Sequence, residues 1–403
     1  MSEPLHVLII GAGITGLLIA QGLKRAGIKY SIFDEEVSPE IRKREWTLNL
    51  HSARSDLKKL LTPDLYSRLR EAYTDPNHIW KELEYTPWYN SKTGEVIHRI
   101  PRTDTINISR RRMRTLCGDG IEVEFGKSLS GVLYEGDKVT AHFSDGSDVQ
   151  GDLLIGADGV RSIVRENLLG AEKANGTPCH GNFTTAIAKY SDAETALRVR
   201  SGDWEACIGY HPDGMCNMIA ISNVPDPDDP TTWEFNIANS VLSEPPKDTD
   251  NASRLQNVRL RCENMAEPFR SSFMDLPDST RVFNDKLYYW IPVPWDNHRG
   301  KTTLAGDAAH PMPPFRGQGL GQSIRDAANL VDLLKKHSSS EEATLSKIID
   351  EYEKEMITRG VQEVELSLKA MSIGHDWDKL MEHPTIKLAG KKISDMKEAV
   401  LSN

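Results

Sequence analysis

The stretch VLIIGAGITG, residues 7–16, decides the fold of this chain. An apolar run that fits a buried strand leads into three glycines with the spacing GxGxxG, and residues 14–26 then have a helical pattern. A second strand follows and ends at Asp34, eighteen residues after Gly16, where a carboxylate can accept hydrogen bonds from a ribose diol. This order of elements is typical of a dinucleotide-binding βαβ unit. The sequence therefore predicts a site for an adenine dinucleotide, which is either FAD or NAD.

Each glycine of this turn is expected at its position for a different structural reason. Gly11 permits a tight turn, Gly13 lets the backbone approach a pyrophosphate, and Gly16 lets the helix pack closely against the strand. The first helical residues, Ile14 and Thr15, are expected to present free N–H groups and the positive end of the helix dipole to the phosphates.

Composition and charge narrow the class of protein. The chain has 403 residues and a formal net charge of −10 at pH 7, which argues against a general nucleic-acid binder. No apolar run approaches the roughly 20 residues needed to cross a bilayer, and the fingerprint lies so close to the N-terminus that we expect no signal peptide. The five cysteines form neither a CxxC nor a zinc pattern, so we expect no metal site and a cytoplasmic protein with free thiols.

The composition alternates between nucleotide-fold and β-rich stretches, which predicts an interrupted α/β fold. The predicted nucleotide-binding domain comprises residues 1–78, 102–176 and 281–335. The predicted β-rich substrate domain comprises residues 79–101 and 177–280. Residues 336–403 are predicted as a C-terminal helical segment, with one long amphipathic helix from Thr344 to about Met371. A ligand pocket between the two domains is the default expectation.

Three further stretches of the sequence predict local structure. Leucines that recur near a period of 3.6 predict that residues 46–73 are largely helical. Two β-leaning runs flank residues 90–94 and predict a hairpin. The proline-rich and acidic stretch from Pro225 to Pro246 predicts a long surface excursion.

Two further strands are predicted to end in a carboxylate and a glycine. One ends at Asp158-Gly159 and the other at Gly306-Asp307. Open α/β sheets bind ligands at the carboxyl ends of their strands, so we expect Asp158 and Asp307 beside one ligand, with Asp307 on ribityl or ribose hydroxyls. For His310, which follows closely, we expect a structural role in the turn.

A proline-rich turn and a glycine-rich helix start follow Asp307. Backbone N–H groups of Gly317, Gly319 and Leu320 can bond to the carbonyl edge of an isoalloxazine ring and stabilise negative charge on it.

These three segments, in this order, resemble the FAD-dependent aromatic hydroxylases, the single-component flavin monooxygenases of the p-hydroxybenzoate hydroxylase type. The likeness covers most of residues 5–335. Residues 108–116, ISRRRMRTL, are similar to a family segment whose first arginine approaches the FAD pyrophosphate, which implies that role for Arg110. The run Arg44-Glu45-Trp46 is similar to fungal-type members, which implies that Arg44 faces the flavin. The chain departs from the family at Gly321, where asparagine is usual, and at Arg325, where an acid is usual.

The resemblance implies a Rossmann-like FAD-binding domain of the GR2 type and an oxidoreductase activity. NADPH or NADH would reduce FAD, and O₂ would form a C4a-hydroperoxyflavin. One oxygen atom would pass by hydroxylation or epoxidation to an aromatic or polycyclic secondary metabolite. We expect a monomer or homodimer with a small-molecule substrate, without nucleic acid and without stable membrane insertion.

The candidate residues fall into three groups. The predicted cofactor-binding residues are Gly11, Gly13, Ile14, Thr15, Gly16, Asp34, Arg44, Arg110, Asp158, Gly306, Asp307, Pro314, Gly317, Gly319, Leu320 and Gly321. The candidates for catalysis are Arg44, Pro314 and Arg316, and for Arg316 a purely structural role is an equal alternative. The candidates for the substrate pocket are Tyr210, His211 and Phe315, followed by Trp80, Trp88 and Trp204, although large aromatic side chains in a β-layer more often belong to the core.

Three alternatives share the fold. A flavoprotein reductase or dehydrogenase would share the glycine fingerprint, but the full motif at Asp158-Gly159 argues against it. A flavin-dependent halogenase would need a W-x-W-x-I-P motif, and YYWIP at residues 288–292 lacks the first tryptophan. A catalytically silent flavin-binding scaffold is kept open by Gly321 and Arg325.

Overall fold

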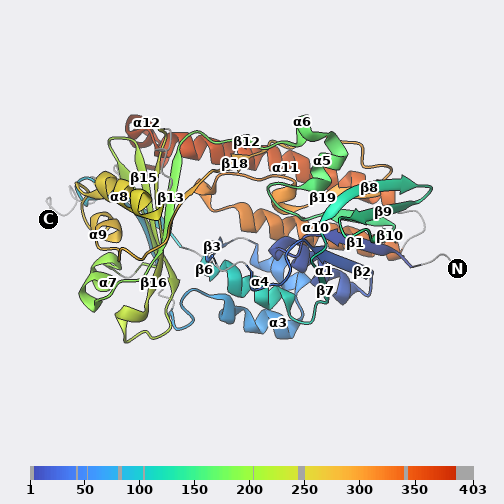
Figure 1. Cartoon of the computed structure of the whole chain (residues 1–403), viewed down its shortest axis with the longest axis horizontal. Helices are drawn as coiled ribbons and strands as arrows, with labels where there is room; N and C mark the ends of the chain where they lie inside the picture. The colour runs from blue at the N-terminus through green and yellow to red at the C-terminus, as the bar shows by residue number, and fades with distance from the viewer. Residues whose placement is uncertain are drawn as a thin grey trace, which may run out of the picture. The chain divides into compact units, whose positions relative to one another are not determined.

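The computed structural model describes residues 4–41, 44–51, 53–79, 84–102, 105–202, 204–243, 250–339 and 344–386. Its contacts divide the chain into two compact units (Figure 1). Unit 1 consists of Met1–Tyr73, Ile108–Cys179 and Tyr288–Leu368, and unit 2 of Thr74–Asn107, His180–Leu287 and Lys369–Asn403. The C-terminal helices form no unit of their own in this division. The predicted domain boundaries stay a proposal.

Unit 1 is built on a parallel sheet of five strands in the order β19-β11-β1-β2-β7. The strands are β19 (Thr302–Leu304), β11 (Leu153–Gly156), β1 (His6–Ile10), β2 (Lys29–Asp34) and β7 (Val123–Phe125). Strands β11 and β19 are fully buried, as expected for a parallel sheet covered on both faces. Because all neighbours run parallel, the carboxyl ends of these strands meet at one edge.

Helices cover one face of this sheet, and a small antiparallel sheet covers the other. The helices are α1 (Ile14–Ala26), α2 (Arg54–Leu60), α4 (Arg110–Gly118) and α10 (Gly319–Ser339). The small sheet contains β8 (Leu129–Glu135), β9 (Lys138–Phe143) and β10 (Asp148–Gly151). Neighbouring residues of β1 show the layering: Ile9 lies next to Gly16 of α1, whereas Leu8 lies next to Gly151 of β10. Helix α1 has the predicted bounds, and Gly27 ends it with φ 69°.

Shorter elements connect these layers. They are β3 (Thr47–Leu50), α3 (Pro63–Ser67), η1 (Arg68–Ala72), β6 (Ile106–Ser109), α5 (Ile163–Leu169), α6 (Ala171–Ala174), β12 (Thr177–Pro178), β18 (Tyr288–Tyr289), η3 (Gly306–Ala308) and η4 (Pro314–Arg316). The prediction for residues 46–73 was partly wrong, because this stretch begins with the strand β3 before the helices follow. Helix α11 (Leu345–Gly374) confirms the predicted long helix, and its residues from 369 on belong to unit 2.

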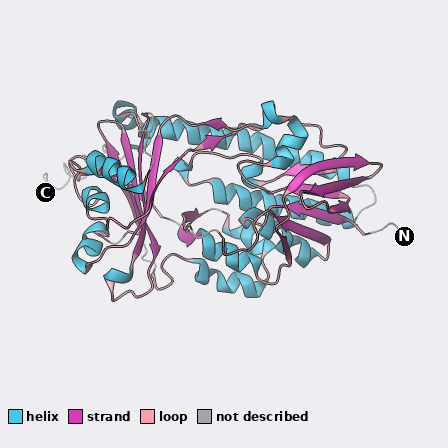
Figure 2. Cartoon of the chain, viewed as in Figure 1, coloured by secondary structure: helices cyan, strands magenta, loops and turns pink. Residues whose placement is uncertain are grey.

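Unit 2 is built on a seven-stranded sheet with helices on one face (Figure 2). In sheet order its strands are β17 (Val282–Asp285), β13 (Asn182–Ala188), β16 (Glu234–Val241), β15 (Met215–Asn223), β14 (Ala206–His211), β4 (Tyr85–Asn90) and β5 (Val96–Pro101). Helices α7 (Ala193–Val199), α8 (Asn251–Cys262) and α9 (Phe269–Met274) share an apolar core with the sheet. The short elements η2 (Pro230–Thr232) and α12 (Trp377–Glu382) complete the unit.

Two predictions about unit 2 had different outcomes. Strands β4 and β5 form the predicted hairpin around residues 90–94. The predicted surface excursion from Pro225 to Pro246 was partly wrong. Residues 225–228 are exposed, but residues 234–241 form β16, which pairs with β13 on one side and β15 on the other, and residues 244–246 lie outside the described part of the chain.

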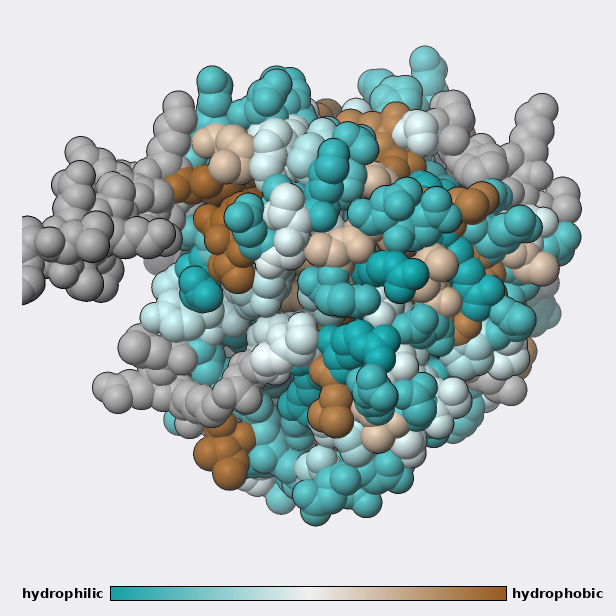
Figure 3. Space-filling model, turned by 90° about the vertical axis from the view of Figure 1, so that its left-hand side faces the viewer, coloured by the Kyte–Doolittle hydropathy of each residue, from teal (hydrophilic) through white to brown (hydrophobic). Residues whose placement is uncertain are grey.

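Figure 3 shows several small groups of brown, hydrophobic residues among hydrophilic ones. Exposed large hydrophobic residues of unit 2 include Leu197, Leu242 and Leu260. Single exposed apolar side chains are ordinary on a globular protein. Among the described residues, no helix combines the length and the apolar character that crossing a membrane requires.

Candidate functional site

The turns that follow three parallel strands touch one another at the carboxyl edge of the unit 1 sheet. A Cβ atom on Gly11 would lie 2.4 Å from the carbonyl oxygen of Ala157 and 2.8 Å from the Cα atom of Asp158. A Cβ atom on Gly306 would lie 2.5 Å from Oγ1 of Thr15. The glycine turn after β1 therefore contacts both carboxylate-bearing loops, so the structure brings the three predicted motifs together.

The glycines at this edge of the sheet differ in whether a side chain would fit. A Cβ atom on Gly16 would lie 2.0 Å from the carbonyl oxygen of Gly11, so close packing alone requires glycine there. A Cβ atom on Gly13, Gly319 or Gly321 would meet nothing within 4 Å. Gly13 is the N-cap of α1 and has no side-chain capping bond. The N-terminus of α1 therefore offers backbone N–H groups next to open space.

Asp34 is buried and shapes the turn around it. One carboxylate oxygen accepts a hydrogen bond from the backbone N–H of Ala12 at 2.7 Å, and the other accepts from Glu36 at 2.9 Å. Arg114, which the sequence reasoning missed, binds Glu36 at 2.8 Å and the carbonyl oxygen of Ala12 at 2.9 Å. Each oxygen of Asp34 keeps a further lone pair, and its bond to a ribose stays a prediction.

Asp158 lies in the loop that connects β11 to α5. Its Oδ2 atom accepts hydrogen bonds from the backbone N–H groups of Ile163 at 2.8 Å and Val164 at 3.1 Å. Its Oδ1 atom is buried and has no hydrogen-bond partner within the described residues. Burial raises the pKa of Asp158, and these bonds oppose the shift. A buried carboxylate oxygen without a partner marks a place for a hydrogen-bond donor of a ligand.

Arg165 joins the two carboxylate-bearing loops. Its guanidinium, 2 % exposed, donates to the carbonyl oxygens of Ala174 at 2.8 Å, Ala308 at 2.7 Å and Val160 at 2.7 Å. The same group lies 4.9 Å from the ring centre of Trp290. Ala308 directly follows Asp307, so Arg165 fixes the loop after β19 relative to the loop after β11.

Asp307 is exposed, whereas its neighbours Gly306 and Ala308 are buried. In the described part of the chain its carboxylate takes part in no hydrogen bond or ion pair. Although the side chain is accessible, the protein atoms around it limit its hydration and raise the pKa of Asp307, while the charges of His310 and Arg110 oppose the shift. Desolvation lowers the pKa of Arg110, and Asp307 is the strongest influence against it. An accessible carboxylate thus lies within the field of an arginine.

A buried network fixes the turn after β19. Oδ2 of Asp326 accepts hydrogen bonds from the backbone N–H of Gly306 at 2.7 Å and pairs with Nε2 of His310 at 2.7 Å. Its Oδ1 atom accepts from Arg359 of α11 at 2.7 Å. Burial would lower the pKa of His310, but the Asp326 carboxylate raises it above its usual value. This geometry agrees with the structural role expected for His310, and Asp326 and Arg359 were missed.

Hydrogen bonds join the segment around Arg44 to the start of α4. Glu45 accepts hydrogen bonds from the hydroxyl of Ser109 at 2.6 Å and from the backbone N–H of Arg111 at 3.3 Å. The guanidinium of Arg44 lies 5.5 Å from the ring centre of Trp46, and its charge contributes to the field at Arg110. The two arginine-bearing segments singled out in the sequence therefore lie together.

The proline-rich loop carries an ion pair. Pro314, Phe315 and Arg316 form η4, and Nη1 of Arg316 lies 2.6 Å from a carboxylate oxygen of Glu363 on α11. Gly317 follows with φ 62°, and a Cβ atom there would lie 2.8 Å from the side-chain amide of Asn49. Glu363 balances the charge of Arg316, which favours the structural alternative for that residue. Asn49 on β3 was missed because nothing in its sequence context marks it.

The candidates for the substrate pocket lie in unit 2, apart from Phe315, and they do not share one surface. Tyr210 is buried, with its ring 5.2 Å from that of Trp88. His211 follows directly in β14 and therefore points to the other face of the sheet. Trp204 belongs to the helix-side core, and Trp80 lies outside the described residues. Contact of any of these residues with substrate stays a prediction.

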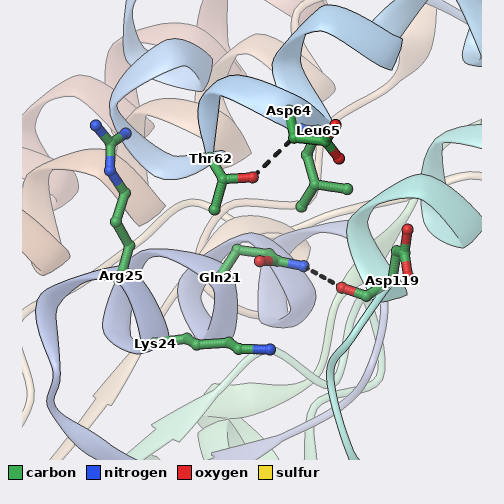
Figure 4. A pocket seen from close by; sticks show the side chains of 7 residues that line it. All are labelled: Gln21, Lys24, Arg25, Thr62, Asp64, Leu65 and Asp119. Atoms are coloured by element: carbon green, nitrogen blue, oxygen red, sulfur yellow. Dashed lines mark hydrogen bonds between the residues drawn. The ribbon is translucent and has the colours of Figure 1, made fainter.

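A separate pocket of about 430 Å³ lies near the C-terminal end of α1 (Figure 4). Its polar side chains are already used to close helix ends. Gln21 donates to the carbonyl oxygens of Cys117 and Asp119 at 2.9 Å, and Arg25 donates to three carbonyl oxygens at the end of α2. From the glycine turn to Lys24 the helix rises about 15 Å, so this pocket is distinct from the site at the strand ends.

The residues at the strand ends fit FAD. They provide an uncapped helix N-terminus beside Gly13, an unpartnered carboxylate oxygen on Asp158, and an accessible carboxylate on Asp307 close to Arg110. The pyrophosphate of FAD can bind to the helix N-terminus and to Arg110. The hydroxyl groups of its ribose and ribityl chain can donate hydrogen bonds to the two carboxylates. Fold and site together define a dinucleotide-binding protein with an interrupted Rossmann-like domain.

Comparisons with known proteins give the family. Residues 4–367 match the family model described as FAD binding domain. The chain is 40% identical over 391 residues to the FAD-dependent monooxygenase phnB of Penicillium herquei, covering 96% of this chain and 95% of that protein. It is 34% identical over 380 residues to the FAD-dependent monooxygenase cctM of Talaromyces islandicus, covering 94% and 95%. The structure of Klebsiella pneumoniae HpxO complexed with FAD and uric acid matches with a TM-score of 0.75 at 19% identity, covering 99% of this chain and 97% of that one.

The chain belongs to the FAD binding domain family and is an FAD-dependent monooxygenase. The predicted family, the interrupted α/β fold and FAD as cofactor are confirmed. The reductase and the silent scaffold receive no support from these relatives.

Proposed function

We propose that this monooxygenase inserts one oxygen atom of O₂ into an aromatic or polycyclic secondary metabolite, with NADPH or NADH as the reductant. The observation that carries the proposal is the convergence of the Gly11 turn, Asp158 and Asp307 at one edge of the parallel sheet. The names of the two fungal relatives support the reaction class. Hydroxylation and epoxidation are both compatible with this site.

The residues proposed to hold FAD are Gly11, Gly13, Ile14, Thr15, Gly16, Asp34, Arg44, Arg110, Asp158, Gly306, Asp307, Pro314, Gly317, Gly319, Leu320 and Gly321. When bound, FAD supplies the transfer of electrons from the nicotinamide and the activation of O₂. The chain supplies charge and position. Arg110 and the N-terminus of α1 neutralise phosphate charge, and Asp158 and Asp307 accept hydrogen bonds from hydroxyl groups.

The loop from Pro314 to Gly321 is proposed to orient the flavin ring. Its backbone N–H groups near Gly317 and Gly319 would stabilise negative charge at the start of α10. The Asp326 network and Arg165 hold this loop and its neighbour in place. Arg44 is proposed to face the ring, and Arg316 to act through its ion pair with Glu363 in positioning the loop.

The test is a coupled assay on the purified protein. We expect a yellow protein that consumes NADPH and O₂ together when a panel of aromatic metabolites is added, and that gives a product heavier by one oxygen atom. Absence of bound flavin, or NADPH oxidation without O₂ uptake, would contradict the proposal.

We further propose a cytoplasmic enzyme that acts as a monomer or homodimer and does not bind nucleic acid. All five cysteines are free, and burial raises the pKa of the thiols, for example to about 12 for Cys117. Unpaired cysteines are typical of a reducing compartment. Cell fractionation and size-exclusion chromatography with light scattering test these points.

A further inference from the structure

The carboxyl end of β2 carries a run of acids beside the site at the strand ends. Four carboxylates occur within seven residues, at Asp34, Glu35, Glu36 and Glu40. Glu35 and Glu40 are exposed, whereas the side chains of Asp34 and Glu36 are only 6 % and 10 % exposed. Asp34 is the residue proposed to bind the adenosine ribose of FAD, so the adenosine end of the proposed site is strongly acidic.

Arg114 of α4 lies between the two enclosed carboxylates. Its Nη1 atom is 2.8 Å from Oε2 of Glu36, and its Nη2 atom is 3.7 Å from Oδ2 of Asp34. Its Nε atom donates to the carbonyl oxygen of Ala12 at 2.9 Å, so the guanidinium contacts the glycine turn itself. The side chain of Arg114 is 12 % exposed. Its charge is therefore enclosed by two acids, directly beside the edge that binds the ligand.

Arg110 lies four residues earlier on the same helix, and its charge has different surroundings. Residues four apart on a helix share a face. Arg110 takes part in no ion pair within the described part of the chain, and the strongest acidic influence on it is the accessible Asp307. Arg110 therefore keeps its charge available for a phosphate group, whereas the charge of Arg114 is already compensated by Glu36.

An acid and an arginine have opposite uses at this end of a dinucleotide site. The acid accepts a hydrogen bond from a free ribose hydroxyl, whereas a nearby arginine accommodates a phosphate on that hydroxyl. Here both are present, but two carboxylates and one guanidinium leave one negative charge in excess. A phosphate brought to this place would meet like charges and an arginine that is already paired.

We propose that Glu36 makes this site select FAD and reject NADPH, because it occupies the guanidinium of Arg114 that would otherwise bind the 2′-phosphate of NADPH. The two dinucleotides share an adenosine diphosphate half and differ there by this one phosphate. The inference rests on the proposed function, in which the strand-end site holds FAD and NADPH is a candidate reductant. A reductant that entered this site would displace the cofactor, so the discrimination keeps the two ligands apart.

A purely structural ion pair between Glu36 and Arg114 predicts a different result. Breaking such a pair would lower the stability of the protein, but it would not change the preference between two ligands that differ in one phosphate. The test therefore compares the two ligands within each variant.

The two ligands are FAD and FAD phosphorylated at the adenosine 2′-hydroxyl. Fluorescence titration gives both dissociation constants on the full-length protein after its flavin has been removed. We expect the wild type to bind the phosphorylated ligand at least about a hundredfold more weakly, because a hydrogen bond to Asp34 is lost and like charges meet. In Glu36→Gln this ratio should fall about tenfold, since the released guanidinium gains a charge-assisted hydrogen bond to the phosphate.

Two further variants show whether the released guanidinium is responsible. Combining Glu36→Gln with Arg114→Met should return the ratio at least to the wild-type value, because the cation that binds the phosphate is gone. The exposed Glu35→Gln removes the same charge one residue away, from a side chain that contacts no arginine in the described part of the chain. Its ratio should stay within about threefold of the wild type, because solvent and salt screen an exposed charge.

Four outcomes overturn the inference. They are equal binding of the two ligands by the wild type, an unchanged ratio in Glu36→Gln, an equal fall of the ratio in Glu35→Gln, and a double variant that still tolerates the phosphate. The comparison of Glu36→Gln with Glu35→Gln decides the matter even where the double variant does not fold. Failure of the proposed function is distinguishable, because it appears as missing flavin or missing NADPH-driven O₂ uptake rather than as a lost preference between two flavins that both bind.

Discussion

At the scale of single residues, two glycines of the same motif separate packing from ligand binding. Gly16 has no room for a side chain, whereas Gly13 has open space in front of it. We predict that Gly13→Val folds with a stability close to that of the wild type and purifies colourless. Gly16→Val should lose about 3 kcal/mol of unfolding free energy or more, because its side chain overlaps the backbone of Gly11.

Flavin absorbance per protein and urea unfolding measure these two effects. Gly136→Val, at a turn where a Cβ atom meets nothing, is the control for bound flavin, although its positive φ makes it less stable than the wild type. A yellow Gly13→Val protein, or a Gly16→Val protein as stable as the wild type, would contradict the assignment of the motif.

Asp307 presents the accessible carboxylate of the site. Since it makes no hydrogen bond in the described part of the chain, its replacement should leave the fold intact. We predict that Asp307→Ala weakens FAD binding at least about tenfold, because hydroxyl groups lose a charged acceptor. Fluorescence titration with FAD measures the change, with the exposed Asp145→Ala as control. Tight retention of FAD by Asp307→Ala would refute its role.

At the scale of elements, Arg165 ties α5 to the loops around it. Three buried carbonyl oxygens take their hydrogen bonds from this one guanidinium. We predict that Arg165→Met lowers the unfolding free energy by about 3 kcal/mol or more, since each unsatisfied carbonyl is destabilising. Urea unfolding of the apoprotein measures it, with the exposed Arg161→Met as the matched control. Equal stabilities of the two variants would show that water replaces the bonds.

Helix α11 carries a buried acid that makes stability depend on pH. Glu353 accepts hydrogen bonds from Trp295 at 3.0 Å and Asn297 at 2.9 Å, yet burial raises its pKa to about 7. The folded protein therefore holds this proton up to about pH 7, whereas the unfolded chain releases it near the ordinary value of 4.5. Stability must fall as pH rises between these values, by about 3 kcal/mol from this group.

We predict that Glu353→Gln flattens this fall, whatever its effect on stability at pH 5. Urea unfolding at pH 5, 6, 7 and 8 gives the slope for the wild type, for Glu353→Gln and for the exposed Glu351→Gln. Parallel slopes for all three proteins would assign the pH dependence to other groups.

Elements with strong local signals were predictable from the sequence, and elements that depend on partners were not. Helix α1, the β4–β5 hairpin and α11 follow from glycine signals and periodicity. Strand β16 reads EFNIANSV, whose asparagines disfavour a strand, and it forms because strands pair with it on both sides. Strand β3 has four residues, too few for an alternating pattern to stand out among the neighbouring leucines.

The candidate site shows the same limit. Its three motifs were predictable because glycines and carboxylates at strand ends have one main use. Asp326 and Arg359 were not, because they act from 20 and 53 residues beyond Gly306, on α10 and α11. Ordinary helix residues at such distances carry no local signal.

At the scale of the whole molecule, unit 1 consists of three separate segments of the chain. Each segment contributes one of the loops that meet at the strand ends, namely those at Gly11, Asp158 and Asp307. Parallel pairing of β1 with β11 and of β11 with β19 joins the same three segments. A ligand that bonds to all three loops therefore stabilises contacts that are distant in sequence, and it binds the folded state only.

Removal of FAD should accordingly destabilise the protein. At a free FAD concentration 100 times the dissociation constant, the bound ligand contributes about 2.7 kcal/mol, which for a chain of 403 residues corresponds to a rise in Tm of roughly 3–6 °C. Differential scanning calorimetry of apoprotein and FAD-loaded protein measures this shift. Gly13→Val should show the Tm of the wild-type apoprotein and no response to FAD. If FAD raises the Tm of Gly13→Val as much as that of the wild type, the flavin binds elsewhere than at the three converging loops.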